Sequence, residues 1–373
     1  MTEAVDGRWT AARELTATLV GDSAGDWDVA GKLPADVLLR MGAEGVLCPQ
    51  VPEAYGGLGM DSLRCGELTA EVGSRCSSLR SVMTSQGIAA WCVTRLGDDA
   101  QRAEWLPRLT SGAVACVAFS EPDAGSDLSA MATRIRPDGD NVIVEGEKVW
   151  TTAAVYADFI LVFGRYADGA AAVIVPSHVP GVRIERRPDP LGCRAAGHAD
   201  IRLDSVRLPG RNVLGGAGQP LGMLVTSALT YGRLSVAWGC VGILRACLTA
   251  ACGHARTRRQ FGKPLAGHQL VARHLAELMV DEQVATLICR QASGHWDDRT
   301  PDLVPSAVLA KHVAARRAAD GAARATQVLA SAGARDGSVV ARAYRDAKLM
   351  EIIEGSNEIC ELILAEQAVT AWA

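Results

Sequence analysis

The sequence predicts an α+β protein in which N-terminal helices, a central β region and C-terminal helices follow one another along the chain. The spacing of apolar residues predicts this order. Apolar residues recur every three to four residues up to about residue 112 and every second residue from about 113 to 218. The three-to-four-residue spacing then returns and continues to residue 373. Because 373 residues can form more than one hydrophobic core, we expect three domains, at residues 1–112, 113–218 and 219–373.

The first region is predicted to hold helices, and the middle region short strands. Apolar spacing indicates helices over residues 9–20, 34–41, 62–72 and 81–96. Runs of β-forming residues between Gly and Pro indicate strands over residues 142–150, 159–163, 171–175, 182–184 and 201–208. Strands this close together, without helices between them, favour an antiparallel sheet or barrel.

The last region is expected to form a four-helix bundle. Helices are predicted over residues 223–258, 267–296, 305–332 and 342–369, the last interrupted at Gly355. In the third helix, apolar residues repeat every seven positions, which is typical of close-packed bundles; they are Val308, Ala315, Ala322 and Leu329.

Composition and charge argue against several classes of protein. The formal net charge is −4 and no basic run is present, so we expect no nucleic-acid partner. The charged first residues do not resemble a signal peptide, and the longest apolar run, 234–244, is shorter than the ~20 residues of a membrane span. The 11 cysteines lack Cys-x-x-Cys spacing and the seven histidines lack metal-site spacing. We therefore expect a cytoplasmic protein with reduced thiols, no metal and no membrane contact.

Two motifs in the β region have the character of a ligand-binding surface. Phe-Ser-Glu-Pro-Asp-Ala-Gly-Ser-Asp, at residues 119–127, combines small residues with hydroxyl and amide donors. Lys-Val-Trp-Thr-Thr, at residues 148–152, ends a strand with an aromatic plane and two hydroxyls. Taken singly, the first could be an ordinary turn and the second an ordinary core tryptophan.

Two further motifs lie on the C-terminal helices. Arg-Arg-Gln-Phe-Gly-Lys, at residues 258–263, follows a helix and either complements the helix dipole or binds phosphate. Tyr-Arg-Asp-Ala-Lys-Leu-Met-Glu-Ile-Ile-Glu-Gly-Ser, at residues 344–356, places Glu354 between two isoleucines and a glycine. Apolar surroundings raise the pKa of a carboxyl group towards the range of a general base. A surface glutamate is the other interpretation of Glu354.

The order and spacing of these four motifs resemble the acyl-CoA dehydrogenase family over nearly the whole chain. The resemblance implies an N-terminal helical domain, a central β-barrel or sandwich, a C-terminal four-helix bundle and FAD as cofactor. It also implies an acyl thioester substrate, with Glu354 removing the α-proton while flavin N5 accepts the β-hydride. Some relatives place the base on an earlier helix, at the position of Gly232 here.

The resemblance also carries over site residues. Those expected at the cofactor are Phe119, Ser120, Gly125, Ser126, Trp150, Thr152, Arg258, Phe261, Gln327 and Ser356. Those expected at the substrate are Thr230, Gly232 and Arg233. Arg258 and Phe261 would reach the FAD of a neighbouring subunit, which implies a homodimer or homotetramer. The Glu354 N–H and a ribityl hydroxyl would hold the enolate oxygen, and an electron-transfer flavoprotein is the kind of electron acceptor expected.

The sequence departs from the family pattern at several positions. Ala330-Ser331 replaces a Gly-Gly pair, and Thr230 replaces an Asp associated with gripping the thioester arm. Trp91 and Trp238 fall on helices that line or back the acyl pocket, where they are either ordinary core residues or shorten the pocket for a small acyl group. The glycine-rich segment at residues 216–222 lacks dinucleotide-motif spacing and is expected to be a plain turn.

Four functions remain open on this evidence. The first is a dehydrogenase acting on a short acyl-CoA. The second is the same chemistry on a short or hydroxylated acyl unit carried by an acyl carrier protein in polyketide or secondary-metabolite biosynthesis. The third is a flavin monooxygenase or oxidase, which the presence of Glu354 disfavours. The fourth is a non-catalytic flavin-binding or scaffold protein, which would be expected to have lost the base or the flavin shell.

Overall fold

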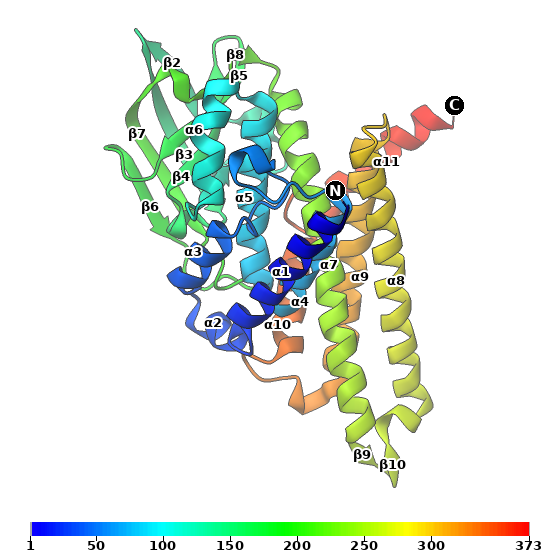
Figure 1. Ribbon diagram of the computed structural model, residues 1–373. Coiled ribbons are helices and arrows are strands. Elements are labelled where there is room, and N and C mark those ends of the chain that lie inside the picture. The colour runs from blue at the N-terminus through cyan, green and yellow to red at the C-terminus, as the bar shows by residue number, and fades with distance from the viewer. Residues whose placement is uncertain (1, 373) are drawn as a thin grey trace.

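The N-terminal helices lie between a β sheet and a long helical bundle (Figure 1). The computed structural model describes residues 2–372. The N-terminal helices are α1 (Thr2–Val20), α2 (Ala24–Ala30), α3 (Ala35–Ala43), α4 (Ser62–Arg75), α5 (Ser77–Leu96) and α6 (Asp99–Thr110). The four predicted helices are confirmed. Two further helices were not predicted: α2, which is only seven residues long, and α6, which begins with a capping box between Asp98 and Gln101.

The central region forms one sheet of eight strands. They are β1 (Ala115–Ala118), β2 (Arg134–Asp138), β3 (Asn141–Thr151), β4 (Phe159–Tyr166), β5 (Gly169–Pro176), β6 (Val182–Arg186), β7 (Ala199–Pro209) and β8 (Val213–Gln219). The order is β6-β7-β3-β2-β4-β5-β8, and β1 pairs with β4. Helix α5 packs against β1, so the sheet and the N-terminal helices share apolar surface.

The predicted antiparallel arrangement holds for most strand pairs, but two of the pairings are parallel. Strands β1 and β2 both run parallel to β4, whereas the remaining pairs are antiparallel. The hairpin β2–β3 lies between β1 and β4 in the sequence and acts as the crossover connection, a role that the prediction reserved for helices. The plain turn expected at residues 216–222 was wrong. Gly216 to Gln219 belong to β8, and Gln219 pairs with Ala170 of β5.

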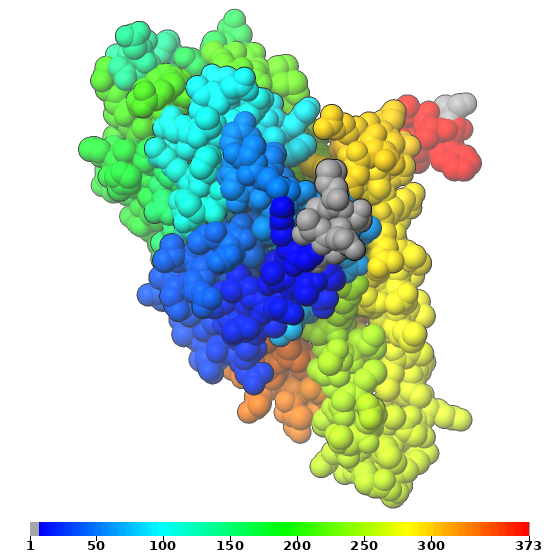
Figure 2. Space-filling view, in the orientation of Figure 1, coloured from blue at the N-terminus to red at the C-terminus, as the bar shows by residue number. Residues whose placement is uncertain are grey.

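The C-terminal region is helical, as predicted. It holds α7 (Leu221–Thr257), α8 (Gln269–Asp297), α9 (Leu303–Leu329), α10 (Val339–Met350) and α11 (Asn357–Ala371), with a short hairpin of β9 (Arg259–Gln260) and β10 (Lys263–Pro264). The predicted interruption at Gly355 is confirmed, since α10 ends before it and α11 begins after it. Figure 2 shows this hairpin region projecting at the lower end of the bundle and α11 projecting near its upper end.

Small side chains let the bundle helices approach closely. Ala315 and Ala322 of the predicted seven-residue repeat are fully buried, and a Cβ at Gly321 would lie 2.5 Å from a methyl carbon of Leu244 on α7. Among the described residues, α7 is the helix long and apolar enough in composition to cross a membrane, but 67 % of its most apolar window is buried inside the protein. Its apolar character is that of a core helix.

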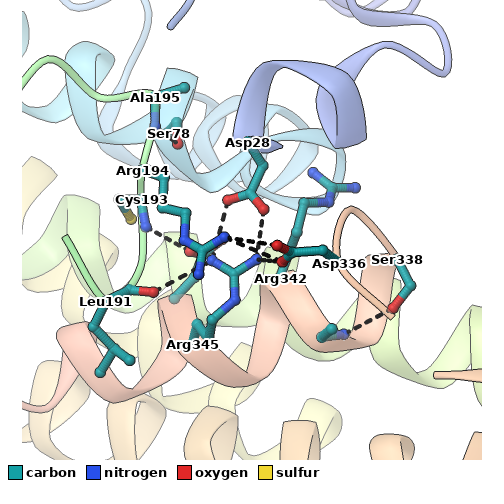
Figure 3. A network of polar contacts seen from close by, with 12 residues as sticks. Asp28, Ser78, Leu191, Cys193, Arg194, Ala195, Asp336, Ser338, Arg342 and Arg345 are labelled. Atoms are coloured by element: carbon teal, nitrogen blue, oxygen red, sulfur yellow. Dashed lines mark hydrogen bonds and ion pairs between the residues drawn. The ribbon is translucent and has the colours of Figure 1, made fainter. Parts of the chain in front are cut away.

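A polar network ties the N-terminal helices to the bundle and to the loop before β7. Arg345 of α10 forms an ion pair with Asp28 of α2, at 2.5 Å, and approaches Asp336, which also pairs with Arg194 (Figure 3). Asp28 and Arg345 are both largely buried, so their pairing is screened little by solvent. The placement of domain borders at residues 112 and 218 stays a prediction.

Candidate active site

Glu354 lies in the loop between α10 and α11, and two buried cations hold the backbone of this loop. Arg233 of α7 donates from Nε to the Glu354 carbonyl at 3.0 Å, and Lys311 of α9 donates from Nζ to the Gly355 carbonyl at 2.7 Å. Glu354 has φ of 55° and Gly355 has φ of 91°, so the chain turns sharply here. These bonds fix the left-handed backbone that aims the glutamate side chain.

The carboxylate of Glu354 is enclosed by apolar and small residues. Its Oε2 is sealed from solvent and has no hydrogen-bond partner. A Cβ at Gly232 of α7 would lie 2.3 Å from Oε2 and 3.0 Å from Cδ1 of Ile88, so the carboxylate occupies space that only glycine leaves open. Burial raises the pKa of Glu354 to about 7, although the charges of Arg233, Lys311 and Arg80 oppose this rise. A carboxylate with this pKa can accept a proton near neutral pH.

The Glu354 backbone offers a hydrogen-bond donor beside this carboxylate. Its N–H has no acceptor among the described residues 2–372, whereas the N–H groups of Ile352 and Ile353 both bond to the carbonyl of Leu349. A free N–H next to a general base can stabilise negative charge on a nearby substrate oxygen.

The segment at residues 119–127 is anchored by a buried ion pair. Lys148 Nζ lies 2.7 Å from the carboxylate of Glu121 and also donates to the Phe119 carbonyl at 3.1 Å. The same carboxylate accepts from the N–H groups of Ala132 and Thr133. Both side chains are almost completely buried, so the pair fixes the start of the segment against β3.

The outer part of this segment is left open. Gly125 and Ser126 are exposed, and a Cβ at Gly125 would meet no atom within 4 Å. Phe119 stacks on Phe163 with ring centroids 4.4 Å apart, and the Ser120 carbonyl accepts from the Val149 N–H. The open backbone can therefore be approached closely by a ligand.

Trp150 and Thr152 form a second part of the surface, at the end of β3. Trp150 has φ of 54° and half of its surface exposed, and its N–H donates to Asp200 at 3.2 Å. Thr152 Oγ1 lies 3.3 Å from Nδ1 of His198, whose Nε2 is sealed from solvent without a partner. Burial lowers the pKa of His198 to about 4, so its ring is neutral at pH 7. A single histidine within Gly-His-Ala forms no recognisable motif, so the sequence did not indicate His198 as a site residue.

Helix α5 connects this surface to Glu354. Ser85 donates from Oγ to the Thr152 carbonyl at 3.3 Å and accepts from the Val117 N–H at 3.2 Å. Ile88, one turn further along α5, faces Gly232 and Glu354. Thr152 and Glu354 therefore lie beside two positions of α5, Ser85 and Ile88, that are about one helical turn apart.

These residues fit a flavin in chemical terms. An isoalloxazine ring needs an aromatic or apolar face and donors at its heteroatoms, and the half-exposed Trp150, the Thr152 hydroxyl and the open backbone at Gly125 offer these. The exposed hydroxyl of Ser126 adds a donor of the kind that a phosphate accepts from. The guanidinium of Arg187, which pairs with Asp200, lies over the Trp150 ring at 5.2 Å from its centroid.

The remaining predicted residues lie on or beside the C-terminal helices. Arg258 and Phe261 stand on the exposed hairpin at the end of the bundle far from the sheet, and the Phe261 side chain is 93 % exposed (Figure 1). Gln327 is exposed on α9. Ser356 caps α11, and the Thr230 hydroxyl donates to the Thr226 carbonyl of its own helix at 2.6 Å. Within one chain, the structure does not bring Arg258, Phe261 or Gln327 to Glu354.

Trp91 and Trp238 both line a cavity of about 170 Å³ between α4, α5, α7 and the end of α8. Trp91 donates to the Ser227 carbonyl at 3.1 Å, and Trp238 to Ser293 Oγ at 3.0 Å. Glu354 does not line this cavity. Trp238 is fully buried and Trp91 is partly exposed, and both narrow this cavity. Their effect on the length of the acyl pocket stays a prediction.

Comparisons with known proteins agree with this architecture. Family models for the acyl-CoA dehydrogenase N-terminal, middle and C-terminal domains match residues 8–113, 116–206 and 222–369. Glutaryl-CoA dehydrogenase of Desulfococcus multivorans is 32 % identical and covers 92 % of this chain, with 90 % of its own length aligned.

Solved structures give the same result. One described as "FkbI for Biosynthesis of Methoxymalonyl Extender Unit of Fk520 Polyketide Immunosuppresant" is 62 % identical, with a TM-score of 0.92, and the match covers 96 % of this chain and 99 % of that one. A glutaryl-CoA dehydrogenase from Mycobacterium smegmatis in complex with FADH2 is 27 % identical, with a TM-score of 0.91, covering 97 % of this chain and 94 % of that one. The chain therefore belongs to the acyl-CoA dehydrogenase family of FAD-dependent enzymes.

Proposed function

We propose that this enzyme introduces a double bond between the α- and β-carbons of a short acyl thioester, with Glu354 as the base. The observation that supports this role is the enclosed carboxylate, whose pKa is raised to about 7 beside the open Gly232. The thioester carbonyl acidifies the α-carbon, and Glu354 takes the α-proton. FAD, when bound, supplies the acceptor for the hydride that leaves the β-carbon.

The surrounding residues prepare this proton transfer. Arg233 and Lys311 hold the loop backbone, and their charges prevent the pKa of Glu354 from rising further. The free Glu354 N–H would donate to the thioester oxygen as negative charge develops on it. Gly232 leaves the space that the Glu354 carboxylate occupies. Because position 232 holds a glycine, this chain has no acid at the α7 position where some relatives place the base.

The surface beside β3 would hold the cofactor. Trp150 and Thr152 would face the flavin ring, while the backbone at Phe119 and Gly125 and the hydroxyls of Ser120 and Ser126 would donate to the remaining acceptors. The buried Lys148–Glu121 pair supports this proposal, because it fixes a segment whose outer backbone is left unobstructed. Ser356, next to Glu354, would contact the same cofactor from the side opposite β3.

The assembly would be a homodimer or homotetramer in which Arg258, Phe261 and Gln327 reach the cofactor of a neighbouring subunit. Phe261 is almost fully exposed, and α8 exposes apolar side chains along its length, namely Leu270, Met279, Val280 and Leu287. Such a row is typical of a covered surface in an oligomer. The electron acceptor would be an electron-transfer flavoprotein or a similar protein, and the cytoplasm is the proposed location.

A second candidate concerns the carrier of the acyl group. The 62 % identity with FkbI, whose description names the biosynthesis of a polyketide extender unit, favours a short or hydroxylated acyl unit on an acyl carrier protein over CoA. Thr230 supports the same candidate, because its hydroxyl is turned to its own helix and does not supply the acid that grips the thioester arm.

Both candidates are tested by anaerobic reduction of the bound flavin. Purified holoenzyme would be mixed with short acyl groups on CoA and on a carrier protein, and loss of the oxidised flavin absorbance would be followed. Bleaching by either donor supports the dehydrogenase, and the faster donor identifies the carrier. A protein that binds FAD but is bleached by no thioester would contradict the proposal.

A further inference from the structure

The side chain of His198 has one polar partner among residues 2–372, and that partner belongs to the surface described for the flavin. Nδ1 lies 3.3 Å from the hydroxyl oxygen of Thr152, whereas Nε2 is sealed from solvent and has no hydrogen-bond partner. The Thr152 hydroxyl in turn contacts no polar atom of the described residues other than this ring. Because the protein covers Nε2, the imidazole communicates with a ligand on this surface only through Thr152.

The sheet holds the two side chains beside each other. His198 directly precedes β7 and Thr152 directly follows β3, and these strands pair through Ala199 and Thr151. The His198 carbonyl also accepts from the Arg187 N–H at 2.9 Å, which ties the other side of the residue to the end of β6. The contact between ring and hydroxyl is therefore set by neighbouring strands.

The His198 ring is neutral at pH 7. Burial, followed by the nearby charge of Arg80, lowers its pKa to about 4. A neutral imidazole carries hydrogen on one nitrogen, and its other nitrogen is an acceptor. The tautomer therefore decides whether His198 or Thr152 donates in the hydrogen bond between them.

The surroundings favour hydrogen on Nδ1 of His198. With hydrogen on Nε2, a buried N–H would lack an acceptor that neither water nor a ligand could supply. The Thr152 hydroxyl would then donate to the ring and have no hydrogen left for the open surface. A flavin ring presents mainly acceptors there, namely ring nitrogens and carbonyl oxygens. With hydrogen on Nδ1, the histidine donates to Thr152, and the hydroxyl hydrogen is free for such an acceptor.

We propose that His198 is a positioning residue whose Nδ1–H donates to Thr152 Oγ1 and so directs the Thr152 hydroxyl hydrogen towards an acceptor atom of the flavin ring. This inference rests on the proposed function, which places FAD at Thr152. A hydroxyl without a donor beside it rotates among several orientations, whereas one that accepts from His198 has its hydrogen turned to the opposite side. His198 thus strengthens FAD binding without touching the cofactor, because the donor is oriented before the ligand arrives.

The tautomer is measured by nitrogen NMR of holoenzyme that contains 15N-labelled histidine. The chain has seven histidines, and His198→Asn identifies the resonances of His198 by their loss. We expect hydrogen on Nδ1 and none on Nε2, which is the less common tautomer of histidine in water. Hydrogen on Nε2 would overturn the proposal, since Thr152 would then donate to the ring and not to FAD.

Three single variants measure the effect on the cofactor. His198→Phe keeps a flat ring but removes the donor, and Thr152→Val removes the hydroxyl. We expect each to raise the dissociation constant for FAD about 3- to 10-fold, as for the loss of one hydrogen bond, and to shift the visible absorption bands of the bound flavin. His198→Asn keeps an N–H near the position of Nδ1 and should restore much of the affinity and the wild-type spectrum.

The double variant tests whether His198 acts through Thr152. His198→Phe combined with Thr152→Val should bind FAD no more weakly than Thr152→Val alone. If His198→Phe weakens FAD binding equally in both backgrounds, its effect does not pass through the hydroxyl and the proposal is wrong. A matched control is His178→Phe, which replaces an exposed histidine between β5 and β6 and should leave affinity and spectrum unchanged.

The outcomes separate this inference from the proposed function. If Thr152→Val binds FAD with wild-type affinity and spectrum, the placement of FAD at Thr152 is wrong, and the role of His198 with it. If Thr152→Val is impaired but His198→Phe is not, or if His198→Asn is impaired as much as His198→Phe, only the positioning role is overturned. Bleaching of the wild type by a thioester tests the dehydrogenase independently. The tautomer is measured in the wild type, so it decides the proposal even if His198→Phe does not fold.

Discussion

Gly232 lies against the carboxylate of Glu354, and a Cβ at position 232 would come within 2.3 Å of Oε2. The two residues are far apart in the sequence and meet because α7 passes beside the loop between α10 and α11. A side chain at position 232 would overlap the base, so the glycine leaves the volume that Glu354 occupies. Because Oε2 is also sealed from water, the place of the carboxylate and its pKa depend on the same contact.

Gly232→Ala should displace the base. We expect the rate of flavin reduction to fall about 10-fold or more while FAD remains bound, because a shift of about 1 Å in a catalytic group can cost 10²-fold. Stopped-flow bleaching measures the rate, and the visible spectrum reports the cofactor. Gly253→Ala on the same helix is a control, since a Cβ there would meet no atom within 4 Å. Equal rates for wild type and Gly232→Ala would show that the enclosure of Glu354 does not matter for catalysis.

Glu354→Gln should bind FAD and substrate but lose proton abstraction. General-base catalysis is worth about 10²- to 10⁴-fold, and we expect a fall of that size in the bleaching rate. Glu351→Gln, one turn earlier on the same segment, is the matched control. If Glu354→Gln bleaches as fast as wild type, another group is the base.

The same substitution should raise the stability of the flavin-free protein at high pH. The pKa of Glu354 is about 7 in the folded protein, above the ordinary value of 4.5 for a glutamate, so the ionised form opposes folding. Wild type and Glu354→Gln should be equally stable below pH 4.5. Between pH 4.5 and 7 the wild type should lose stability, and above pH 7 the variant should be more stable by about 1–3 kcal/mol. Urea unfolding at pH 4.5 and 8 measures the difference, and a variant that is less stable at pH 8 would contradict the assigned pKa.

Lys311→Met should shift the pH dependence of catalysis. The bleaching rate of wild type at limiting substrate should rise with pH through about 7, as Glu354 ionises. The charge of Lys311 holds the pKa of Glu354 down, so its removal should move this rise to higher pH. Lys263→Met, an exposed lysine on the hairpin, controls for loss of charge elsewhere. An unmoved midpoint in Lys311→Met would mean that this lysine only supports the loop.

The Lys148–Glu121 pair should determine FAD affinity through the segment that it anchors. Removing one partner leaves a buried charge unpaired, which costs about 3–5 kcal/mol. We expect Lys148→Met or Glu121→Leu to weaken FAD binding and lower stability, and the double variant to recover much of the stability without full FAD affinity. Urea unfolding of the flavin-free protein and fluorescence titration with FAD separate the two effects. If the single variants bind FAD as tightly as wild type, the pair contributes to stability and not to FAD binding.

Periodicity and motif order in the sequence were enough to predict the helices, the β region and the family. Apolar spacing reports which face of a segment is buried, and this is why the helix beginning near Met223 and the break at Gly355 were predicted correctly. Glu354 was identifiable because its motif is local in the chain. Its neighbours were not, because nothing in the sequence relates Ile88 or Arg80 to it. The parallel pairing of β1 with β4 was missed for the same reason, since strand order is set by contacts between distant segments.

The sequence by itself thus determined the class of the fold, the family and the residue proposed as the base, because these depend on local patterns and on a linear order of motifs. Tertiary structure alone decided the environment of Glu354. Burial, and with it the pKa of a carboxylate, depends on which helices enclose the group. Gly232 shows this most directly, since the space that it leaves open is filled by a side chain from another part of the chain.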